Sequence, residues 1–492
     1  MLFNSFHFLV FLPVVVLAYF LLPQRFRNFW LLVASYYFYM CWNAKYVVLL
    51  LFSTLLTYVC AILIENIHKS GQRKGKAVLA VCVLGNLGVL FYFKYMNFFL
   101  RTLTKLFAAA HIQLTFPAFD ILLPVGISFF TFQTLGYVID VYRGDTKAEK
   151  KLIQYALFVS FFPQLVAGPI ERSKNLLHQL KRPRRFCLED AKEGLLLMLW
   201  GFFLKIVLAD RIALFVDVVY GDIEAYPGMY LIVATVLFAF QIYCDFYGYS
   251  AIAKGAAKTL QIDLMDNFKA PYLSENIKEF WRNWHISLTS WLTDYLYIPL
   301  GGNRGGTVRA SFNRLAVFFA SGLWHGAGLS FIVWGILNGV FQILSDLLKG
   351  FRDSCVRILR IDRSQIGFRI VRILLTFCLV DFTWIFFRAA SLGQACQALY
   401  SMIHVHNPWI LFDESLFGCG LERADFMLLV IGIAILFFAD LYRKRSIRIR
   451  DIILSQHIIL RIVIWVFAIM SILIFGIYGP SYLAANFIYF QF

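Results

Sequence analysis

Long stretches without charged residues are the feature that most limits how this chain folds. The longest covers residues 315–345. A helix of about 20 residues already crosses a hydrocarbon core of about 30 Å, and this run as one straight helix would measure about 46 Å. Residues 322–328 (GLWHGAG) lie near its middle. The sequence therefore predicts either two helices that meet there or one steeply tilted helix.

Other runs with at most one charged residue predict further membrane-embedded helices. They lie at residues 2–22, 29–42, 46–64, 77–93, 121–139, 152–170, 194–209, 229–248, 373–387, 426–439 and 462–479. We expect an all-α polytopic membrane protein with roughly 11 to 13 membrane-embedded helices, forming one domain over residues 1–492. The run at 152–170 contains Pro163, Gly168 and Pro169, which predict a re-entrant or broken element.

Composition supports a membrane protein and excludes two other classes. Hydrophobic residues make up 60% of the chain and charged residues 15%, whereas soluble domains carry roughly 25% charged residues. A soluble enzyme is therefore excluded. A disordered or nucleic-acid-binding chain is excluded as well, because such chains do not bury this much apolar surface.

The net charge of +17 has two interpretations. Basic residues collect in cytoplasmic loops of multi-pass proteins, and this bias explains most of the basic clusters. A minority could instead meet an anionic ligand or lipid headgroups. The predicted cytoplasmic loops are residues 69–76, 172–192, 349–372 and 443–450, which predicts a chain that crosses its membrane many times.

Residues 251–283 mix charged and apolar side chains and predict an amphipathic helix in the plane of the membrane surface. The segment that follows places polar and ionisable residues among tryptophans and tyrosines. Such residues are expensive at membrane depth and mark a functional site. The candidates are Arg282, Asn283, Trp284, His285, Asp294 and Tyr297.

Two histidines stand in apolar surroundings, His285 and His325. Each taken alone is more typical of a hydrogen-bonded packing residue than of a catalyst. His325 lies in the long uncharged run, between Trp324 and Gly326, where small neighbours allow another backbone or an acyl chain to approach. A neutral imidazole there can take a proton from a hydroxyl group. No metal site is expected, because His404 and His406 lack a carboxylate partner at ligand spacing.

The glycine-rich stretch at residues 301–306, which contains Arg304, also leaves two interpretations open. It is either a flexible turn with arginines that determine topology, or a cradle of backbone and arginine groups for phosphates. It is no P-loop, because no Gly-Lys-Ser/Thr ends it.

Several motifs together resemble the membrane-bound O-acyltransferase superfamily, and most closely its bacterial alginate O-acetyltransferase-like branch. The main ones are FWRNWHISL at 280–288, DYLYIPLGG at 294–302 and GLWHG at 322–326. Weaker similarity covers residues 123–133, 162–170, 243–246 and 486–492.

This resemblance implies a helical fold around a tunnel or funnel, with His325 as the catalytic histidine and His285 as a second active-site position. It implies no bound cofactor. It further implies a location in a bacterial inner or cytoplasmic membrane. There a cytoplasmic thioester, expected to be acetyl-CoA, would donate an acetyl group, and an extracytoplasmic partner acetyltransferase would transfer it to an exported or cell-surface polysaccharide. We expect His325 to be the general base, and groups near His285 and Asn283 to polarise the thioester carbonyl. The expected substrate-binding residues are Trp324, Asn283, Arg282, Trp284, Asp294, Tyr297 and Arg304.

Two alternatives remain at this level. The first is D-alanyl transfer to teichoic acid from a carrier protein, because those proteins resemble this chain in the same two histidine motifs. The second is a transporter or export channel without enzymatic activity, although the internal repeats typical of transporters are not visible in the sequence.

Overall fold

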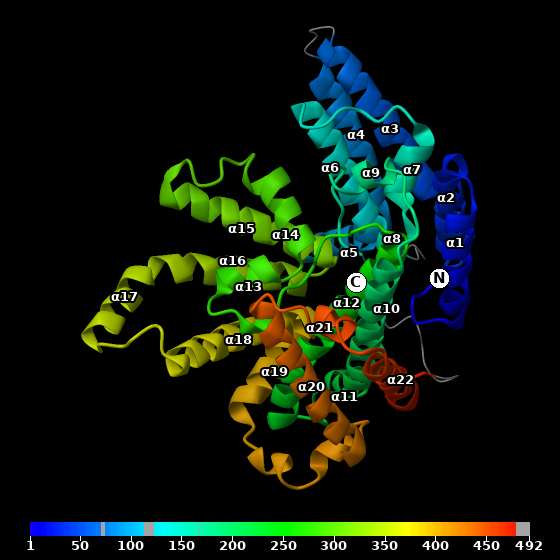
Figure 1. The fold of residues 1–492 in the computed structure, drawn as a ribbon. Coiled ribbons are helices and arrows are strands. Elements are labelled where there is room, and N and C mark those ends of the chain that lie inside the picture. Colours follow the sequence, from blue (N-terminus) through cyan, green and yellow to red (C-terminus); the bar gives the residue numbers. More distant parts are fainter. Residues whose placement is uncertain (70–73, 113–122, 167, 479–492) are drawn as a thin grey trace. The chain divides into compact units, whose positions relative to one another are not determined.

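The computed structural model describes residues 1–69, 74–112, 123–166 and 168–478, all shown as helices and connecting segments in Figure 1. Within these ranges no β-strand occurs. The all-α prediction is confirmed. Arg73, the start of the predicted span at 121–139, Ala167 and the motif at 486–492 lie outside the described residues.

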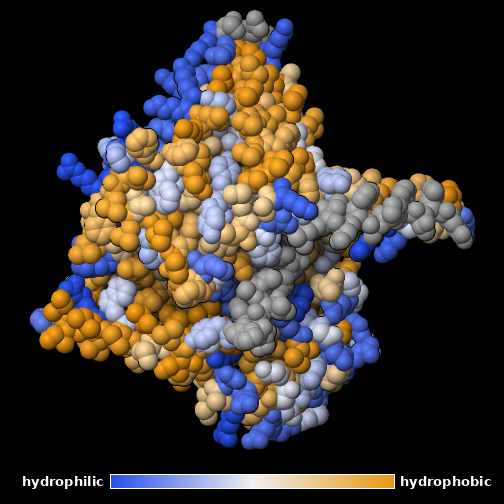
Figure 2. All heavy atoms as spheres, turned by 90° about the vertical axis from the view of Figure 1, so that its right-hand side faces the viewer, coloured by the Kyte–Doolittle hydropathy of each residue, from blue (hydrophilic) through white to orange (hydrophobic). Residues whose placement is uncertain are grey.

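Seven helical segments are long and apolar enough to cross a membrane, counted within the described ranges. They are Ala44–Lys69, Gly75–Ala109, Met229–Thr259, Leu329–Leu347, Ile366–Arg388, Arg423–Lys444 and Ile458–Phe475. Large apolar side chains stay exposed along them, and Figure 2 shows such side chains spread over one face. An exposed apolar surface of this kind is favourable in contact with lipid and unfavourable in contact with water. The chain is a multi-pass membrane protein; the total of 11 to 13 embedded helices and the tunnel stay predictions.

Contacts group the described residues into two compact units, and the predicted single domain stays a prediction. Within the described ranges, unit 1 comprises residues 1–198 and 250–265. Its main elements are α1 Phe6–Leu21, α2 Gln24–Met40, η1 Ala44–Tyr46, α3 Val47–Lys69, α4 Gly75–Leu90, η2 Phe91–Tyr95, α5 Met96–Ala109, α6 Ile127–Arg143, α7 Leu152–Ser160, α8 Phe162–Leu165 and α9 Leu176–Leu180.

Unit 2 comprises residues 199–249 and 266–483. Two helices, α10 Leu188–Phe202 and α12 Met229–Thr259, contain residues of both units. The remaining elements are η3 Phe203–Ala209, α11 Asp210–Gly221, η4 Pro271–Leu273, α13 Ile277–Asn283, α14 Ile286–Leu292, η5 Thr293–Tyr297, α15 Gly306–His325, α16 Leu329–Leu347, α17 Lys349–Ile358, α18 Ile366–Arg388, α19 Leu392–His404, η6 Pro408–Leu411, η7 Ser415–Gly418, α20 Arg423–Lys444, α21 Ile449–Leu454 and α22 Ile458–Phe475.

The long uncharged run forms two helices, the first of the two predicted outcomes. α15 ends at His325 and α16 begins at Leu329. The two helices pack closely because glycines remove side chains from their contact. A Cβ atom on Gly322 would overlap the backbone oxygen of Phe331, and one on Gly335 would overlap that of Phe318. The predicted close approach beside His325 is therefore confirmed.

The run at residues 152–170 is broken, as its prolines and glycine predicted. α7 ends at Ser160, and the short α8 follows after Phe161. Because Pro163 stands in the first turn of α8, its missing N–H leaves no helical hydrogen bond unmade.

The in-plane helix predicted at residues 251–283 is wrong. Residues 251–259 continue α12, whose Gly255 packs against the backbone of Gly194. The chain then leaves the helix at Leu260 and forms only η4 before α13 begins. The alternation of charged and apolar residues here reflects a folded loop, in which Lys258 forms an ion pair with Asp263 at 2.9 Å.

Candidate active site

The turn that carries His285 has an unusual backbone. α13 ends at Asn283, α14 begins at Ile286, and His285 between them has φ 44° and ψ 54°. This left-handed conformation is uncommon for residues other than glycine, although Asn, Asp and His adopt it more often than most. Surrounding contacts must therefore hold His285 in place.

A second segment, centred on Asn267, supplies those contacts. The backbone oxygen of Asn267 accepts a hydrogen bond from Ile286 N (2.9 Å), and its side-chain Oδ1 accepts one from Ser287 N (3.3 Å). On the other side of the turn, Lys269 N donates to the backbone oxygen of Asn283 (3.0 Å). Asn267 is buried. Its side chain thus satisfies one of the free N–H groups at the start of α14, as an N-cap side chain does.

We expect Asn267→Ala to misplace His285 without unfolding the protein. Loss of the cap costs about 1 kcal/mol of stability, while a small displacement of the imidazole lowers kcat by roughly tenfold to hundredfold. KM should change little, and Asn267→Asp, which also accepts the N–H, should restore kcat. Steady-state kinetics and Tm of the three proteins test this. An Asn267→Ala variant with the kcat of the parent would contradict the positioning role.

His325 is the last residue of α15, and its ring is surrounded by aromatic side chains. Its ring centroid lies 4.9 Å from that of Trp324, 5.0 Å from that of Trp334 and 5.2 Å from that of Phe387. All three rings meet the imidazole edge to face, and His325 is 4% exposed. The residue therefore lies in an apolar, water-poor environment.

The two histidine motifs converge, as the sequence predicted. Trp324 contacts both rings, because its centroid lies 5.8 Å from that of His285 and 4.9 Å from that of His325. On its other side, His285 meets Phe246 of α12 at 4.6 Å. Trp284 also belongs to this cluster, through Trp384 of α18 (5.2 Å). Segments more than 30 residues apart thus form one aromatic cluster around two imidazoles.

The environment of His285 favours its neutral form. This residue lies outside the seven candidate spans and is 1% exposed. Burial lowers the pKa of His285 to about 3, because a charged imidazolium loses its hydration there. At neutral pH the ring therefore carries one N–H donor and one acceptor nitrogen.

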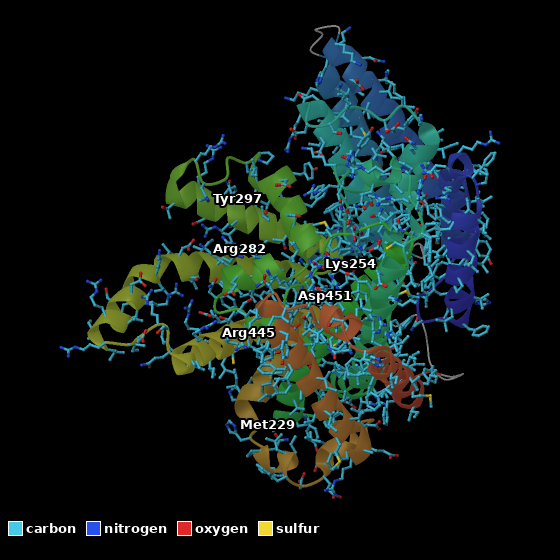
Figure 3. All side chains as sticks on the ribbon, in the orientation of Figure 1. Met229, Lys254, Arg282, Tyr297, Arg445 and Asp451 are labelled. Carbon is cyan, nitrogen blue, oxygen red and sulfur yellow. The ribbon has the colours of Figure 1, made fainter. Side chains whose placement is uncertain are left out.

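The other predicted site residues lie away from this cluster. Arg282, Asp294 and Arg304 are exposed. The positions of Arg282 and Tyr297 are labelled in Figure 3. The Tyr297 hydroxyl donates to Asn303, and Asn283 Nδ2 donates to Ser274 Oγ at 3.3 Å. None of these side chains is part of the aromatic cluster described above, and their role in the site stays a prediction. A binding role at the surface remains open to the arginines.

A buried ion cluster that was not predicted from the sequence is centred on Lys205 of η3. Lys205 Nζ lies 2.8 Å from Asp210 Oδ1 and 2.7 Å from Asp245 Oδ1, and all three side chains are buried. The cluster joins η3 and α11 to α12, directly before the residue that contacts His285. The available signal was Lys205 itself, a charged residue inside a predicted span.

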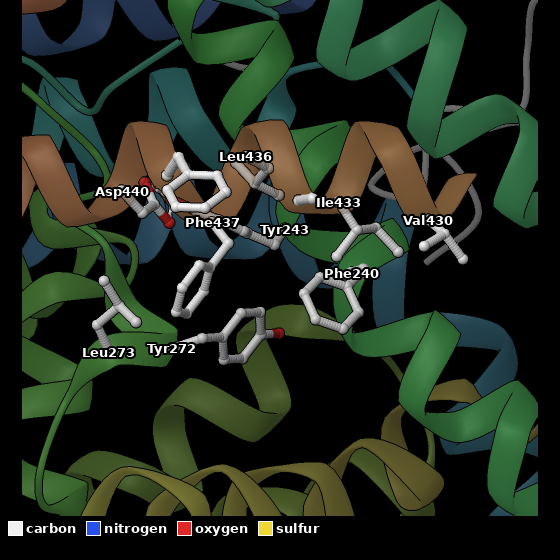
Figure 4. A pocket seen from close by; sticks show the side chains of 11 residues that line it. Phe240, Tyr243, Tyr272, Leu273, Val430, Ile433, Leu436, Phe437 and Asp440 are labelled. Carbon is white, nitrogen blue, oxygen red and sulfur yellow. Dashed lines mark hydrogen bonds between the residues drawn. The ribbon is translucent and has the colours of Figure 1, made fainter. Parts of the chain in front are cut away.

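A cavity of about 300 Å³ lies beside α12, and neither histidine is among the residues that line it. Figure 4 shows its lining by α12, η4 and α20, including Phe240, Tyr272 and Phe437. Asp440 forms its polar end and accepts a hydrogen bond from the Tyr243 hydroxyl at 2.9 Å. In the described part of the chain, no three His, Cys, Asp or Glu side chains gather in a way that could hold a metal ion.

Comparison with known proteins identifies the family. A family model described as membrane-bound O-acyltransferase matches residues 149–380. Over 450 residues the chain is 36% identical to the probable alginate O-acetylase of Pseudomonas syringae pv. tomato, covering 91% of this chain and 83% of that protein. The chain belongs to the membrane-bound O-acyltransferase family. It is therefore an O-acyltransferase, and the alternative of a transporter without enzymatic activity is wrong.

This O-acyltransferase is also similar to two relatives with other named substrates. It is 34% identical over 443 residues to the peptidoglycan O-acetyltransferase of Helicobacter pylori, covering 83% of this chain and 80% of that protein. Identity to the teichoic acid D-alanyltransferase of Bacillus subtilis is 25% over 247 residues, covering 47% of this chain and 61% of that protein. The matched family region contains both histidine motifs.

Proposed function

We propose that this O-acyltransferase moves an acetyl group from cytoplasmic acetyl-CoA through a bacterial cytoplasmic membrane for O-acetylation of an exported or cell-surface polysaccharide. An extracytoplasmic partner acetyltransferase would complete the transfer. The observation that carries the proposal is the convergence of His285 and His325 on Trp324 inside a buried aromatic cluster. Support for the acetyl group comes from the relatives that match most of the chain, which are named as an alginate O-acetylase and a peptidoglycan O-acetyltransferase.

In the proposed mechanism His325 is the general base. Its imidazole takes the proton of the acceptor hydroxyl while the hydroxyl oxygen attacks the acetyl carbonyl carbon. The carbon–sulfur bond then breaks, and the same proton passes from His325 to the departing thiolate, so that free CoA thiol and an acetyl ester are formed. His325 ends α15, and the negative end of the helix dipole stabilises the imidazolium that forms in between.

His285 is proposed to polarise the carbonyl. As a neutral imidazole it offers one N–H, which would donate to the carbonyl oxygen as negative charge develops there. The Asn283 amide donates to Ser274, so in the observed conformation we assign the carbonyl contact to His285 and not to Asn283. The aromatic walls exclude water, which would otherwise hydrolyse the thioester.

The phosphates of the donor are proposed to bind at the glycine-rich stretch that precedes α15. Arg304 is exposed there, and Arg309 donates to the backbone oxygen of Leu300 at 3.3 Å, which orients its guanidinium. Together, Arg304 before α15 and Arg309 in the first turn of α15 match the charge of a diphosphate. Trp324 and Trp284 would line the acetyl end of the donor.

The donor distinguishes this proposal from D-alanyl transfer. We expect the purified protein, in proteoliposomes supplied with an acceptor polysaccharide, to release CoA thiol from acetyl-CoA at least about hundredfold faster than its His325→Ala variant, because the variant lacks the general base. The measurement is a thiol-reactive dye assay with acetyl-CoA in one set of vesicles and a D-alanyl carrier protein in another. Turnover of the D-alanyl carrier with none of acetyl-CoA would overturn the acetyl assignment.

A further inference from the structure

α17 joins two candidate membrane spans and is therefore held at one membrane surface. α16 ends at Leu347 and α18 begins at Ile366, and both helices are long and apolar enough to cross a membrane. In Figure 1 α17 forms the outer end of the yellow segment between them. None of its residues is buried, so no other described part of the chain covers this helix.

One side of α17 is apolar. Leu348, Phe351, Cys355, Ile358 and Leu359 recur at intervals of three or four residues and so lie on a single face. The large members of this face are strongly exposed, with Phe351 at 69%, Ile358 at 78% and Leu359 at 67%. A continuous exposed apolar face of this kind needs a partner. The position of the helix between two spans makes the acyl region of the bilayer that partner.

The remaining surface of α17 and of the segment after it is basic. Its positive side chains are Lys349, Arg352, Arg357, Arg360 and Arg363, against the acidic Asp353 and Asp362. Arg363 forms an ion pair with Asp353, and Arg352 donates to the backbone oxygen of Ser345 (2.6 Å). In the described part of the chain, Lys349, Arg357 and Arg360 have no acidic partner within ion-pair distance. Three positive charges are thus left for an external anion.

We infer that α17 is an in-plane helix that binds the headgroups of anionic phospholipids. The apolar face enters the acyl region, while Lys349, Arg357 and Arg360 meet phosphate and other anionic groups at the surface. A basic side chain near an anionic leaflet contributes about a fivefold preference for anionic over zwitterionic lipid. The residues lie near the end of α16, where Asp346 pairs with Lys278 of α13 and with Arg314 of α15 (2.6 Å). This end of the α15–α16 pair lies opposite to the turn that carries His325.

The inference predicts a lipid-selective crosslink. Full-length protein in phosphatidylcholine nanodiscs receives a trace of diazirine-bearing phosphatidylglycerol or, separately, diazirine-bearing phosphatidylcholine, and labelled peptides are mapped by mass spectrometry. We expect peptides from residues 349–360 to carry roughly fivefold or more label from the glycerol lipid. In the triple variant Lys349→Gln, Arg357→Gln, Arg360→Gln this ratio should fall to about one.

A charge-matched variant separates the role of α17 from that of overall charge. Lys147, Lys174 and Arg185 are exposed basic residues outside unit 2, and their joint replacement by Gln should leave the ratio at α17 unchanged. Size-exclusion profiles confirm that each protein is folded. Equal labelling by the two lipids in the unmodified protein would overturn the headgroup inference. Absence of label from both lipids would overturn the membrane-surface position and favour a protein partner at α17.

Discussion

Replacing His325 with alanine is expected to reduce acetyl transfer by at least about hundredfold, the contribution typical of a positioned general base. The ring is enclosed by Trp324, Trp334 and Phe387, so no bulk water replaces it as a proton acceptor. His325→Gln keeps much of the side-chain volume but has no basic nitrogen, and it should lose activity to a similar extent. CoA release and acetylation of the exported polymer are the measurements.

His404 provides the matched control for this experiment. It is an exposed histidine whose Nδ1 lies 2.9 Å from the backbone oxygen of Tyr400, and it stacks on the Tyr400 ring. His404→Ala should retain full activity. Membrane insertion and Tm of all variants must remain close to those of the parent, since loss of a buried ring alone destabilises by about 0.5 to 3 kcal/mol. A folded His325→Ala protein with more than about a tenth of the activity would remove His325 from the mechanism.

The second large effect is expected at His285. Substitutions there can distinguish the effect of backbone strain on stability from the effect of the N–H donor on kcat. His285→Gly relieves the left-handed strain, which amounts to about 1–2 kcal/mol for other residues, and it removes the N–H donor. The relief of strain offsets part of the roughly 0.5 to 3 kcal/mol lost with the buried ring, so the Tm should change little, while kcat falls by about 10² to 10³, as after loss of an oxyanion donor.

His285→Asn gives the complementary result. Asparagine adopts the left-handed conformation readily and offers an amide donor, so we expect a smaller loss of kcat than in the glycine variant. Thermal unfolding and kcat of the two variants are compared with those of the parent. Wild-type kcat in a folded His285→Gly protein would show that the second histidine only packs.

Much of the fold could be predicted because membrane helices are a local property of the sequence. Uncharged runs of sufficient length correspond to α3, α12, α16 and α20, and residues 322–328 correctly indicated a break before α16. The error at residues 251–283 has a clear cause. Periodicity does not distinguish an in-plane helix from a loop whose charges pair with one another, as Lys258 and Asp263 do. The amphipathic helix α17 was not predicted as a helix, because it lies in the basic segment 349–372 that predicts a cytoplasmic loop.

The residues of the candidate site could likewise be predicted only in part. Its histidines could be found, because a polar ring in an apolar run is visible in the sequence. Asn267 could not, since a buried asparagine in a connecting segment gives no signal until the turn that it caps is known. The sequence also did not show that Arg282 and Trp284, two residues apart, have different environments. Arg282 is exposed, whereas Trp284 belongs to the aromatic cluster.

By itself, then, the sequence determined that this chain is a helical membrane protein with two functionally suspect histidines, and its motifs resembled the O-acyltransferase family. Hydropathy and residue identity are sufficient for these conclusions, because crossing a membrane depends on the properties of one continuous segment. Only the tertiary structure decided that Trp324 lies between His285 and His325, that Asn267 holds the left-handed turn, and that Phe246 contacts His285. These contacts join residues 20 to 39 positions apart in the sequence, and the packing of helices against one another, not any local pattern, selects them.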